Sequence, residues 1–197
     1  ATQRPEKLKA VFDGETLTVS ASLCVQFSLC AGMELDEEAF SALKAAVAKE
    51  AARERAVRIL TASAVSEREL EKRLLQKGML PSDAADAVAW LKEHRFLDDA
   101  ATAAQLVDSA VRKGYGRARV KNILYEKGIP KDLWDEALAR IPAMDDAIDR
   151  FLAAKLRGRT ADEKTIKKTI DALLRRGHAW GDIRRALERY DPDLPEE

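Results

Sequence analysis

The sequence predicts an all-α fold in which one three-helix module of helix-turn-helix type occurs three times in tandem, after a small N-terminal extension. The first indication is a repeat: Gly78, Gly128 and Gly177 follow one another at intervals of 50 and 49 residues, with matching apolar positions around them. The second is composition, because good helix formers dominate the chain from residue 36 onward. With 197 residues, 46% of them hydrophobic, the chain is long enough to bury a core.

The N-terminal extension, residues 1–55, differs from the rest. Asp13-Gly14 stands between two short apolar stretches, which predicts a β-hairpin over residues 7–20. Residues 20–30 alternate as a strand would, but also show helical spacing, and we favour a short helix capped by Ser20. Asp36 followed by two glutamates predicts the N-cap of a helix over 36–50 that leads into the first module.

The repeat is defined by apolar positions at fixed offsets from each glycine. A base precedes each glycine, and large apolar residues stand three and four positions before it. Those before the glycines are Leu74 and Leu75, Leu124 and Tyr125, and Leu173 and Leu174. The residues six, nine, ten and thirteen positions after the glycines are Ala84, Ala87, Val88 and Leu91 in the first module, Trp134, Ala137, Leu138 and Ile141 in the second, and Ile183, Ala186, Leu187 and Tyr190 in the third. This pattern predicts a helix that ends at the glycine and a second helix after it.

Helix starts divide the chain into modules at 56–99, 100–146 and 147–190, with an acidic tail at 191–197. Ser66 and Thr160 begin capping-box patterns that open the helix leading to the glycine. Asp98-Asp99 and Asp145-Asp146 precede the first helix of the second and third modules. Paired carboxylates can bind metal or transfer protons, but at a helix start a capping role is favoured.

Composition and spacing argue against several classes of protein. Two cysteines, Cys24 and Cys30, do not make a disulfide scaffold, and partly buried free thiols are expected. No Cys/His spacing fits zinc, and no glycine-rich phosphate loop or membrane span is present, so we expect no metal, no cofactor and a cytoplasmic protein. The three tryptophans are expected in the core.

Positive charge is concentrated locally, since 34 bases balance 34 acids overall. Residues 147–190 alone carry twelve bases and six acids. The candidate contacts to a partner or to DNA are the bases outside the apolar stripes, with one loop aromatic. They are Arg112, Lys113, Tyr115, Arg117, Arg119 and Lys121 in the second module and Lys155, Arg157, Arg159, Lys164, Lys167, Lys168, Arg175, Arg176, Arg184 and Arg185 in the third. The alternative is that these bases only form solvent-exposed helix faces and contact no partner. Tyr115, in the Gly114-Tyr115-Gly116 loop, is either an exposed loop aromatic or the anchor of a small core, and we favour the exposed position.

The motifs of the modules, in their order and spacing, resemble those of the RecX family of regulators. They are Ala56-Val57-Arg58-Ile59-Leu60, Ser66-Glu67-Arg68-Glu69-Leu70, Lys77-Gly78, Phe96-Leu97-Asp98-Asp99, Lys113-Gly114 and Lys127-Gly128-Ile129. The third module departs from the pattern, with Arg176-Gly177-His178 in place of Lys-Gly-Ile, and residues 100–104 lack the usual Phe-Ala.

The resemblance implies an elongated, curved array of modules that binds the RecA recombinase and its nucleoprotein filament. It implies inhibition of ATP hydrolysis and strand exchange in recombination and the DNA-damage response, and no catalytic residues. A protein of this kind is expected to be a monomer and not an enzyme. The alternative that the residues leave open is a protein that binds single- and double-stranded DNA by itself, through the basic third module.

Overall fold

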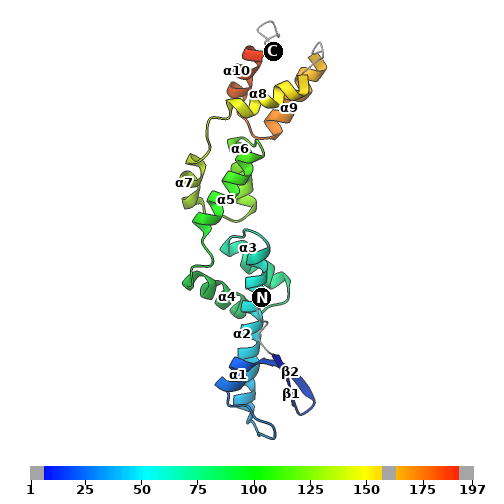
Figure 1. The fold of residues 1–197 in the computed structure, drawn as a ribbon, viewed down its shortest axis with the longest axis vertical. Coiled ribbons are helices and arrows are strands. Elements are labelled where there is room, and N and C mark those ends of the chain that lie inside the picture. Colours follow the sequence, from blue (N-terminus) through cyan, green and yellow to red (C-terminus); the bar gives the residue numbers. More distant parts are fainter. Residues whose placement is uncertain (1–6, 157–162, 191–197) are drawn as a thin grey trace. The chain divides into compact units, whose positions relative to one another are not determined.

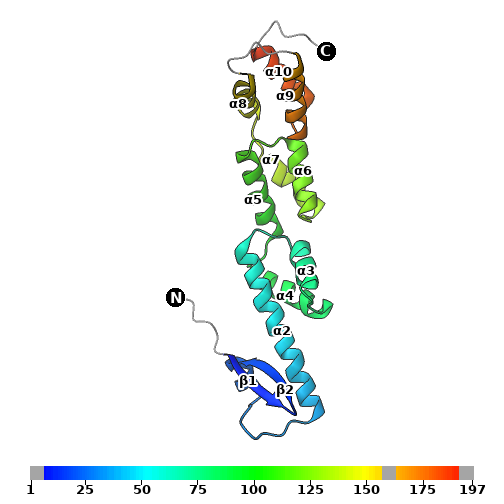
Figure 2. The same cartoon turned by 90° about the vertical axis from the view of Figure 1, so that its right-hand side faces the viewer.

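The computed structural model describes residues 7–156 and 163–190. Within these ranges it contains a two-stranded sheet and ten α-helices, which confirms the predicted all-α fold with a small hairpin extension (Figures 1 and 2). The described residues up to Ser63 form one compact unit with Leu70–Leu97. Ala64–Glu69 and the described residues from Asp98 onward form a second unit. The predicted tail at 191–197 and the capping position Thr160 lie outside the described residues.

The hairpin forms where the sequence predicts it. Strands β1 (Lys7–Phe12) and β2 (Glu15–Ser20) pair antiparallel, and Asp13-Gly14 makes the turn with φ of 45° and 86°. Ser20 then caps α1 (Ala21–Gln26), because its hydroxyl accepts a hydrogen bond from the amide of Leu23 at 3.2 Å.

A long helix, α2 (Glu37–Ala62), connects the extension to the first module. Asp36 caps it by accepting a hydrogen bond from the amide of Ala39 at 2.7 Å, as predicted. The hairpin, α1 and α2 share a small core of Val19, Leu23 and Leu43. Cys24 is half-buried at this core, but Cys30 is exposed, so only one thiol is partly buried as expected, and both are free.

The first module consists of the end of α2, α3 (Glu67–Gln76) and α4 (Pro81–Glu93), and α2 packs along α4. Its fully buried positions include Ala56, Leu70, Leu74, Ala84, Ala87 and Leu91. An ion pair from Arg53 to Asp86 at 2.8 Å joins α2 to α4, and the same guanidinium lies 5.3 Å from the centroid of Trp90.

The second module consists of α5 (Asp99–Arg112), α6 (Arg117–Glu126), a 3₁₀ turn at Lys131–Leu133 and α7 (Trp134–Ala139). Its core contains Ala103, Val107, Val120, Leu124, Ala137 and Leu138. Trp134 packs on this core and donates its indole N–H to the carbonyl of Ile129 at 3.0 Å.

The third module consists of α8 (Asp145–Leu156), α9 (Glu163–Arg175) and α10 (Trp180–Tyr190). Its core contains Ile148, Leu152, Leu156, Leu173, Ile183 and Ala186. Trp180 is 46% exposed, so the prediction that it lies in the core is wrong, whereas the other two tryptophans are half-buried.

The repeat pattern predicts part of the packing correctly. The leucines four positions before each glycine and the alanines nine positions after it are buried in all three modules. The pattern also predicts core positions three residues before each glycine, and this prediction is wrong. Leu75, Tyr125 and Leu174 are 41%, 71% and 43% exposed. Tyr190 is also exposed, and Ile141 follows the end of α7.

Candidate functional site

The exposed side of α9 concentrates positive charge. It carries four cations on the side of the helix opposite the buried Leu173. This basic face of α9 consists of Lys164, Lys167, Lys168 and Arg175. None of the four forms an ion pair within the part of the chain that the structure describes, and one carboxylate, Asp171, lies among them. Cations without intramolecular partners retain their charge for a phosphate or an acidic protein surface.

Several other predicted cations have an acidic partner nearby. Arg119 pairs with Glu126 at 3.1 Å, Arg184 pairs with Glu188 at 3.0 Å, and Arg185 pairs with Asp182. All these pairs are solvent-accessible, so they contribute little to stability and a stronger partner can replace them. Their positive charge is nevertheless partly neutralised, in contrast to that of the basic face of α9.

The loop Gly114-Tyr115-Gly116 is not the exposed contact loop that we expected. Tyr115 is half-buried and packs against the core of the second module. Arg176 donates hydrogen bonds to the carbonyls of Lys113 and Gly114, and its guanidinium lies 5.2 Å from the ring centroid of Tyr115 and 5.1 Å from that of Phe151. Two predicted contact residues, Tyr115 and Arg176, therefore hold the second module to the third.

Backbone contacts complete this junction. The amide of Gly116 donates to the carbonyl of Arg176 at 2.9 Å, and the amide of Ala118 donates to the carbonyl of Gly177 at 3.1 Å. A Cβ atom added to Gly116 would lie 2.2 Å from the carbonyl oxygen of Gly177, so the backbones of the two segments are in direct contact. These carbonyls satisfy amides in the first turn of α6 that no side chain caps.

His178 adds a side-chain contact at the same place. It is 6% exposed, and its Nε2 lies 3.1 Å from the carbonyl oxygen of Gly114. A carbonyl only accepts, so Nε2 carries the proton and donates. Burial lowers the pKa of His178, although the hydrogen bond to Gly114 opposes this effect. The ring is therefore neutral at pH 7.

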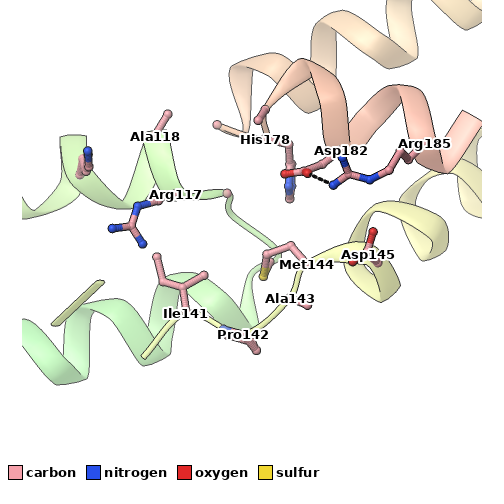
Figure 3. A pocket seen from close by; sticks show the side chains of 14 residues that line it. Arg117, Ala118, Ile141, Pro142, Ala143, Met144, Asp145, His178, Asp182 and Arg185 are labelled. Carbon is pink, nitrogen blue, oxygen red and sulfur yellow. Dashed lines mark hydrogen bonds and ion pairs between the residues drawn. The ribbon is translucent and has the colours of Figure 1, made fainter. Parts of the chain in front are cut away.

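A groove of about 560 Å³ opens beside the junction (Figure 3). Its lining comes from the start of α6, the segment before α8 and the start of α10, and includes Arg117, Lys121, Arg185, Asp145 and Asp182. The Arg117 guanidinium donates to the carbonyl of Leu138 at 3.2 Å, and Figure 3 shows Asp182 paired with Arg185. Mixed charge suits side chains of a partner protein better than a row of phosphates.

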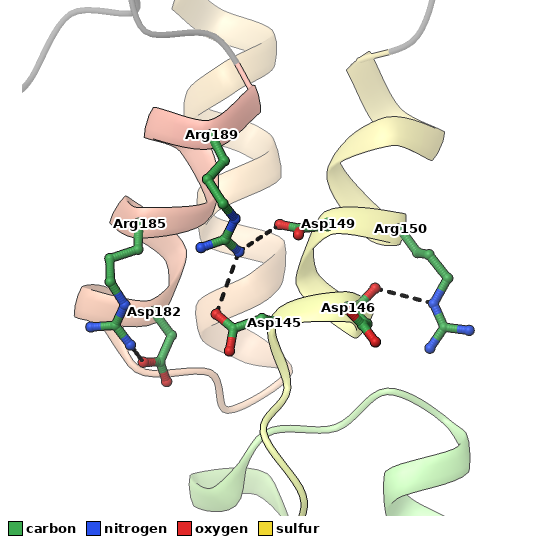
Figure 4. Close-up of polar contacts among 7 residues, drawn as sticks. All are labelled: Asp145, Asp146, Asp149, Arg150, Asp182, Arg185 and Arg189. Atoms are coloured by element: carbon green, nitrogen blue, oxygen red, sulfur yellow. Dashed lines mark hydrogen bonds and ion pairs between the residues drawn. The ribbon is translucent and has the colours of Figure 1, made fainter.

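Three of the four paired carboxylates at the helix starts have structural roles. Asp98 caps α5 by accepting from the amides of Ala100 and Ala101 at 2.8 and 3.0 Å. Asp99 accepts from the amide of Glu67 at 2.9 Å. At the start of α8, Figure 4 shows Arg189 between two acids, and it lies 3.4 Å from Asp145 and 2.8 Å from Asp149. No cluster of potential metal ligands occurs among the described residues.

The side chains of the other predicted site residues in the described ranges are exposed, although the carbonyl of Lys113 belongs to the junction. Arg112 and Lys113 are exposed at the end of α5, and Lys155 is exposed on α8. Arg157 and Arg159 lie outside the described residues. None of the helices that the structure describes has both the length and the apolar composition needed to cross a membrane.

Sequence reasoning missed the role of His178, whose contact lies 64 residues away along the chain. A signal for it was present, because the third module has Arg-Gly-His where the second has Lys-Gly-Ile, and Gly116 stands where the first module has Ser66. Both departures from the repeat fall at the same junction.

Comparison with known proteins agrees with this architecture. Family models match residues 52–91 as the first three-helix domain of RecX and residues 98–138 as its second three-helix domain. A crystal structure of regulatory protein RecX superposes with a TM-score of 0.72 at 21% identity, covering 92% of this chain and 94% of that one. A crystal structure of RecX from Lactobacillus salivarius superposes with a TM-score of 0.66 at 16% identity, covering 75% of this chain and 99% of that one.

Sequence relatives are closer. The regulatory protein RecX of Cronobacter sakazakii is 33% identical over 153 residues, which cover 70% of this chain and 91% of the relative. The regulatory protein RecX of Escherichia coli K12 is 33% identical over 151 residues, which cover 70% of this chain and 90% of the relative. Three tandem helical modules, two family-model matches and this extent of identity show that the chain belongs to the RecX family of regulatory proteins.

Proposed function

We propose that this protein binds the RecA recombinase on its nucleoprotein filament and inhibits ATP hydrolysis and strand exchange. The observation that carries the proposal is 33% identity with regulatory protein RecX across 91% of that relative's length. The name of the relatives associates them with regulation, and the filament is the partner that the family resemblance implies. Through this role the protein would act in recombination and the response to DNA damage.

The basic face of α9 is the surface that the structure offers most clearly for such contact. A recombinase filament on DNA presents phosphates and acidic side chains, and guanidinium and ammonium groups bind both. The cations of α9 are exposed and without ion-pair partners among the described residues. We assign to them electrostatic attraction and orientation, whereas the neutralised cations of α6 and α10 contribute less.

A binding measurement with matched variants tests this assignment. Fluorescence anisotropy of the labelled chain is measured against RecA assembled on single-stranded DNA, for the triple variant Lys164→Glu, Lys168→Glu and Arg175→Glu. The control changes charge equally at three exposed lysines elsewhere, Lys9, Lys72 and Lys131, all to Glu. We expect at least ten-fold weaker binding for the α9 variant and less than three-fold for the control. Equal affinities of the two variants would contradict a role for the α9 face.

The alternative function, DNA binding without a recombinase, is favoured by the same cations. Titration with salt on duplex DNA distinguishes it, because log K falls with log salt by about 0.9 per phosphate contact. Tight binding to DNA alone, with a slope that the α9 variant reduces by about three contacts, would support this alternative. Undetectable binding at low salt would exclude it and leave the filament as the ligand.

A further inference from the structure

The turn that follows the second helix of each module has the same backbone in all three modules. In each, the glycine amide donates to the carbonyl three residues earlier, at 2.9, 3.0 and 2.9 Å for Gly78, Gly128 and Gly177. The next amide donates to the carbonyl five residues earlier, at 3.2, 3.0 and 3.2 Å. The glycines have φ of +80°, +70° and +85°. Any difference between the three turns therefore lies in their surroundings.

In the second and third modules this turn is occupied by the preceding module. The carbonyl of Lys127 accepts a hydrogen bond from the hydroxyl of Ser66 at 2.5 Å. The carbonyl of Arg176 accepts one from the amide of Gly116 at 2.9 Å. Ser66 and Gly116 are equivalent positions, each directly before the helix that leads to its module's glycine. The occupant in both cases is the N-terminus of an α-helix.

The close approach of that helix is visible at the glycines. A Cβ atom added to Gly128 would lie 3.3 Å from Ser66 Oγ and from Arg68 Cβ, and one added to Gly177 would lie 2.2 Å from the amide nitrogen of Arg119. Gly128 is half-buried and Gly177 is buried. The residues after them, Ile129 and His178, are 4% and 6% exposed.

The first module presents the same turn without an occupant. Lys77 and Gly78 are exposed, and Met79 is half-buried where Ile129 and His178 are buried. No described atom beyond the chain neighbours of Gly78 lies within 4 Å of the position of an added Cβ. The surface that joins the modules to one another is therefore open at Lys77–Met79.

We propose that the Lys77–Met79 turn is a docking site for the N-terminus of an α-helix in a partner protein, with Ser or Gly at the N-cap position. A helix C-terminus exposes carbonyls and carries partial negative charge, so it attracts amide and hydroxyl donors at a helix N-terminus. This inference rests on the proposed function, in which the partner helix belongs to a subunit of the recombinase filament.

The test uses Gly78→Asn in the 197-residue chain. Asparagine tolerates positive φ, so the turn is retained, but its side chain occupies the space where the partner helix would lie. Gly14→Asn is the matched control, because Gly14 also has positive φ, +86°, and also has no atom within 4 Å of an added Cβ. We expect Gly78→Asn to bind the RecA–DNA filament at least ten-fold more weakly than the wild type, with Gly14→Asn unchanged and thermal unfolding similar for both.

The outcomes separate the two proposals. If the wild-type chain binds the filament and Gly78→Asn binds equally well, the docking site is wrong and the proposed function stands. If the wild type does not bind, the proposed function fails, and with it the assignment of the helix to the recombinase. Concentration-dependent self-association that Gly78→Asn abolishes, measured by sedimentation velocity, would place a second copy of this chain at the turn and overturn the proposal.

A measurement without substitutions provides an independent check. Hydrogen exchange of the wild-type chain is followed with and without the filament. Docking of a helix predicts slower exchange of the amides from Lys77 to Leu80, whereas the hairpin turn at Asp13-Gly14 exchanges at an unchanged rate. Exchange at Lys77–Leu80 that the filament does not slow would contradict the proposal.

Discussion

Replacing the repeated glycines with alanine, one at a time, measures the interaction between modules separately from the conformational requirement of the turn. All three glycines close a helix with φ between +70° and +85°, so each alanine has the same left-handed backbone to adopt. The space around the new methyl group differs. It is open at Gly78, limited to 3.3 Å at Gly128 and only 2.2 Å from a backbone nitrogen at Gly177.

These distances give an ordered series of destabilisation. Left-handed backbone costs an L-residue about 1–2 kcal/mol, and this is the whole effect expected for Gly78→Ala. Forcing a methyl group into a filled space adds about 1–3 kcal/mol. Since the backbone of Arg119 obstructs the methyl group at Gly177, both contributions apply, and Gly177→Ala should lose about 2–5 kcal/mol. Gly128→Ala should fall between the two, because the atoms it meets belong to side chains that can move.

Urea denaturation followed by circular dichroism gives the total loss of stability, and native-state hydrogen exchange shows where it occurs. Exchange is needed because a chain of two compact units does not guarantee a single two-state transition. Faster exchange in α9 is expected only for Gly177→Ala, whereas α6, which Gly128 closes, is affected by Gly128→Ala as well. Equal losses for Gly78→Ala and Gly177→Ala would refute the description of the junction.

Two further predictions concern the cores of the second and third modules. Leu124→Ala should destabilise the chain by about 2–5 kcal/mol, because Leu124 is fully buried, whereas Tyr125→Ala at a 71% exposed position should change stability by less than about 0.5 kcal/mol in the same urea titration. Folding lowers the pKa of His178 from 6.5. Below pH 6.5 the unfolded state therefore binds more protons than the folded state. The stability that is present above pH 6.5 is lost as the pH falls through the pKa of the folded protein. The melting temperature of the wild type should therefore drop more steeply between pH 7 and 5 than that of His178→Gln, and parallel profiles would contradict this assignment.

Local features of this fold follow from the sequence because they depend on residues a few positions apart. Asp13-Gly14 sets a turn by its own backbone preferences, and Ser20, Asp36 and Asp98 cap helices through amides two or three residues away. The helix-closing glycines are of the same kind. For these elements the sequence contains all of the interacting partners within one turn.

Contacts between modules do not follow in this way. The sequence pattern places Tyr115 in an exposed loop, but Arg176 covers its ring from a position 61 residues later in the chain. Helical periodicity equally places Leu75, Tyr125 and Leu174 beside buried leucines, yet each is solvent-exposed. Which side of a helix a neighbouring module covers depends on tertiary packing, and the repeat pattern alone does not determine it.

The basic face of α9 illustrates the intermediate case. The excess positive charge of the third module marks the four cations of this face as candidate contacts from the sequence alone. The structure shows how these four differ from other cations of the third module. Arg176 is hydrogen-bonded at the junction, and Arg184 and Arg185 form ion pairs with acidic residues. Charge was visible in the sequence, but its availability depends on which carboxylates the fold brings near.

Inhibition of RecA is measured directly by its DNA-dependent ATPase, followed while the 197-residue chain is added to filaments on single-stranded DNA. We expect ATP hydrolysis to fall progressively and to be largely suppressed at or below one molecule of this chain per recombinase subunit. An ATPase rate that stays constant over this range, with the added chain folded by circular dichroism, would contradict the proposed function.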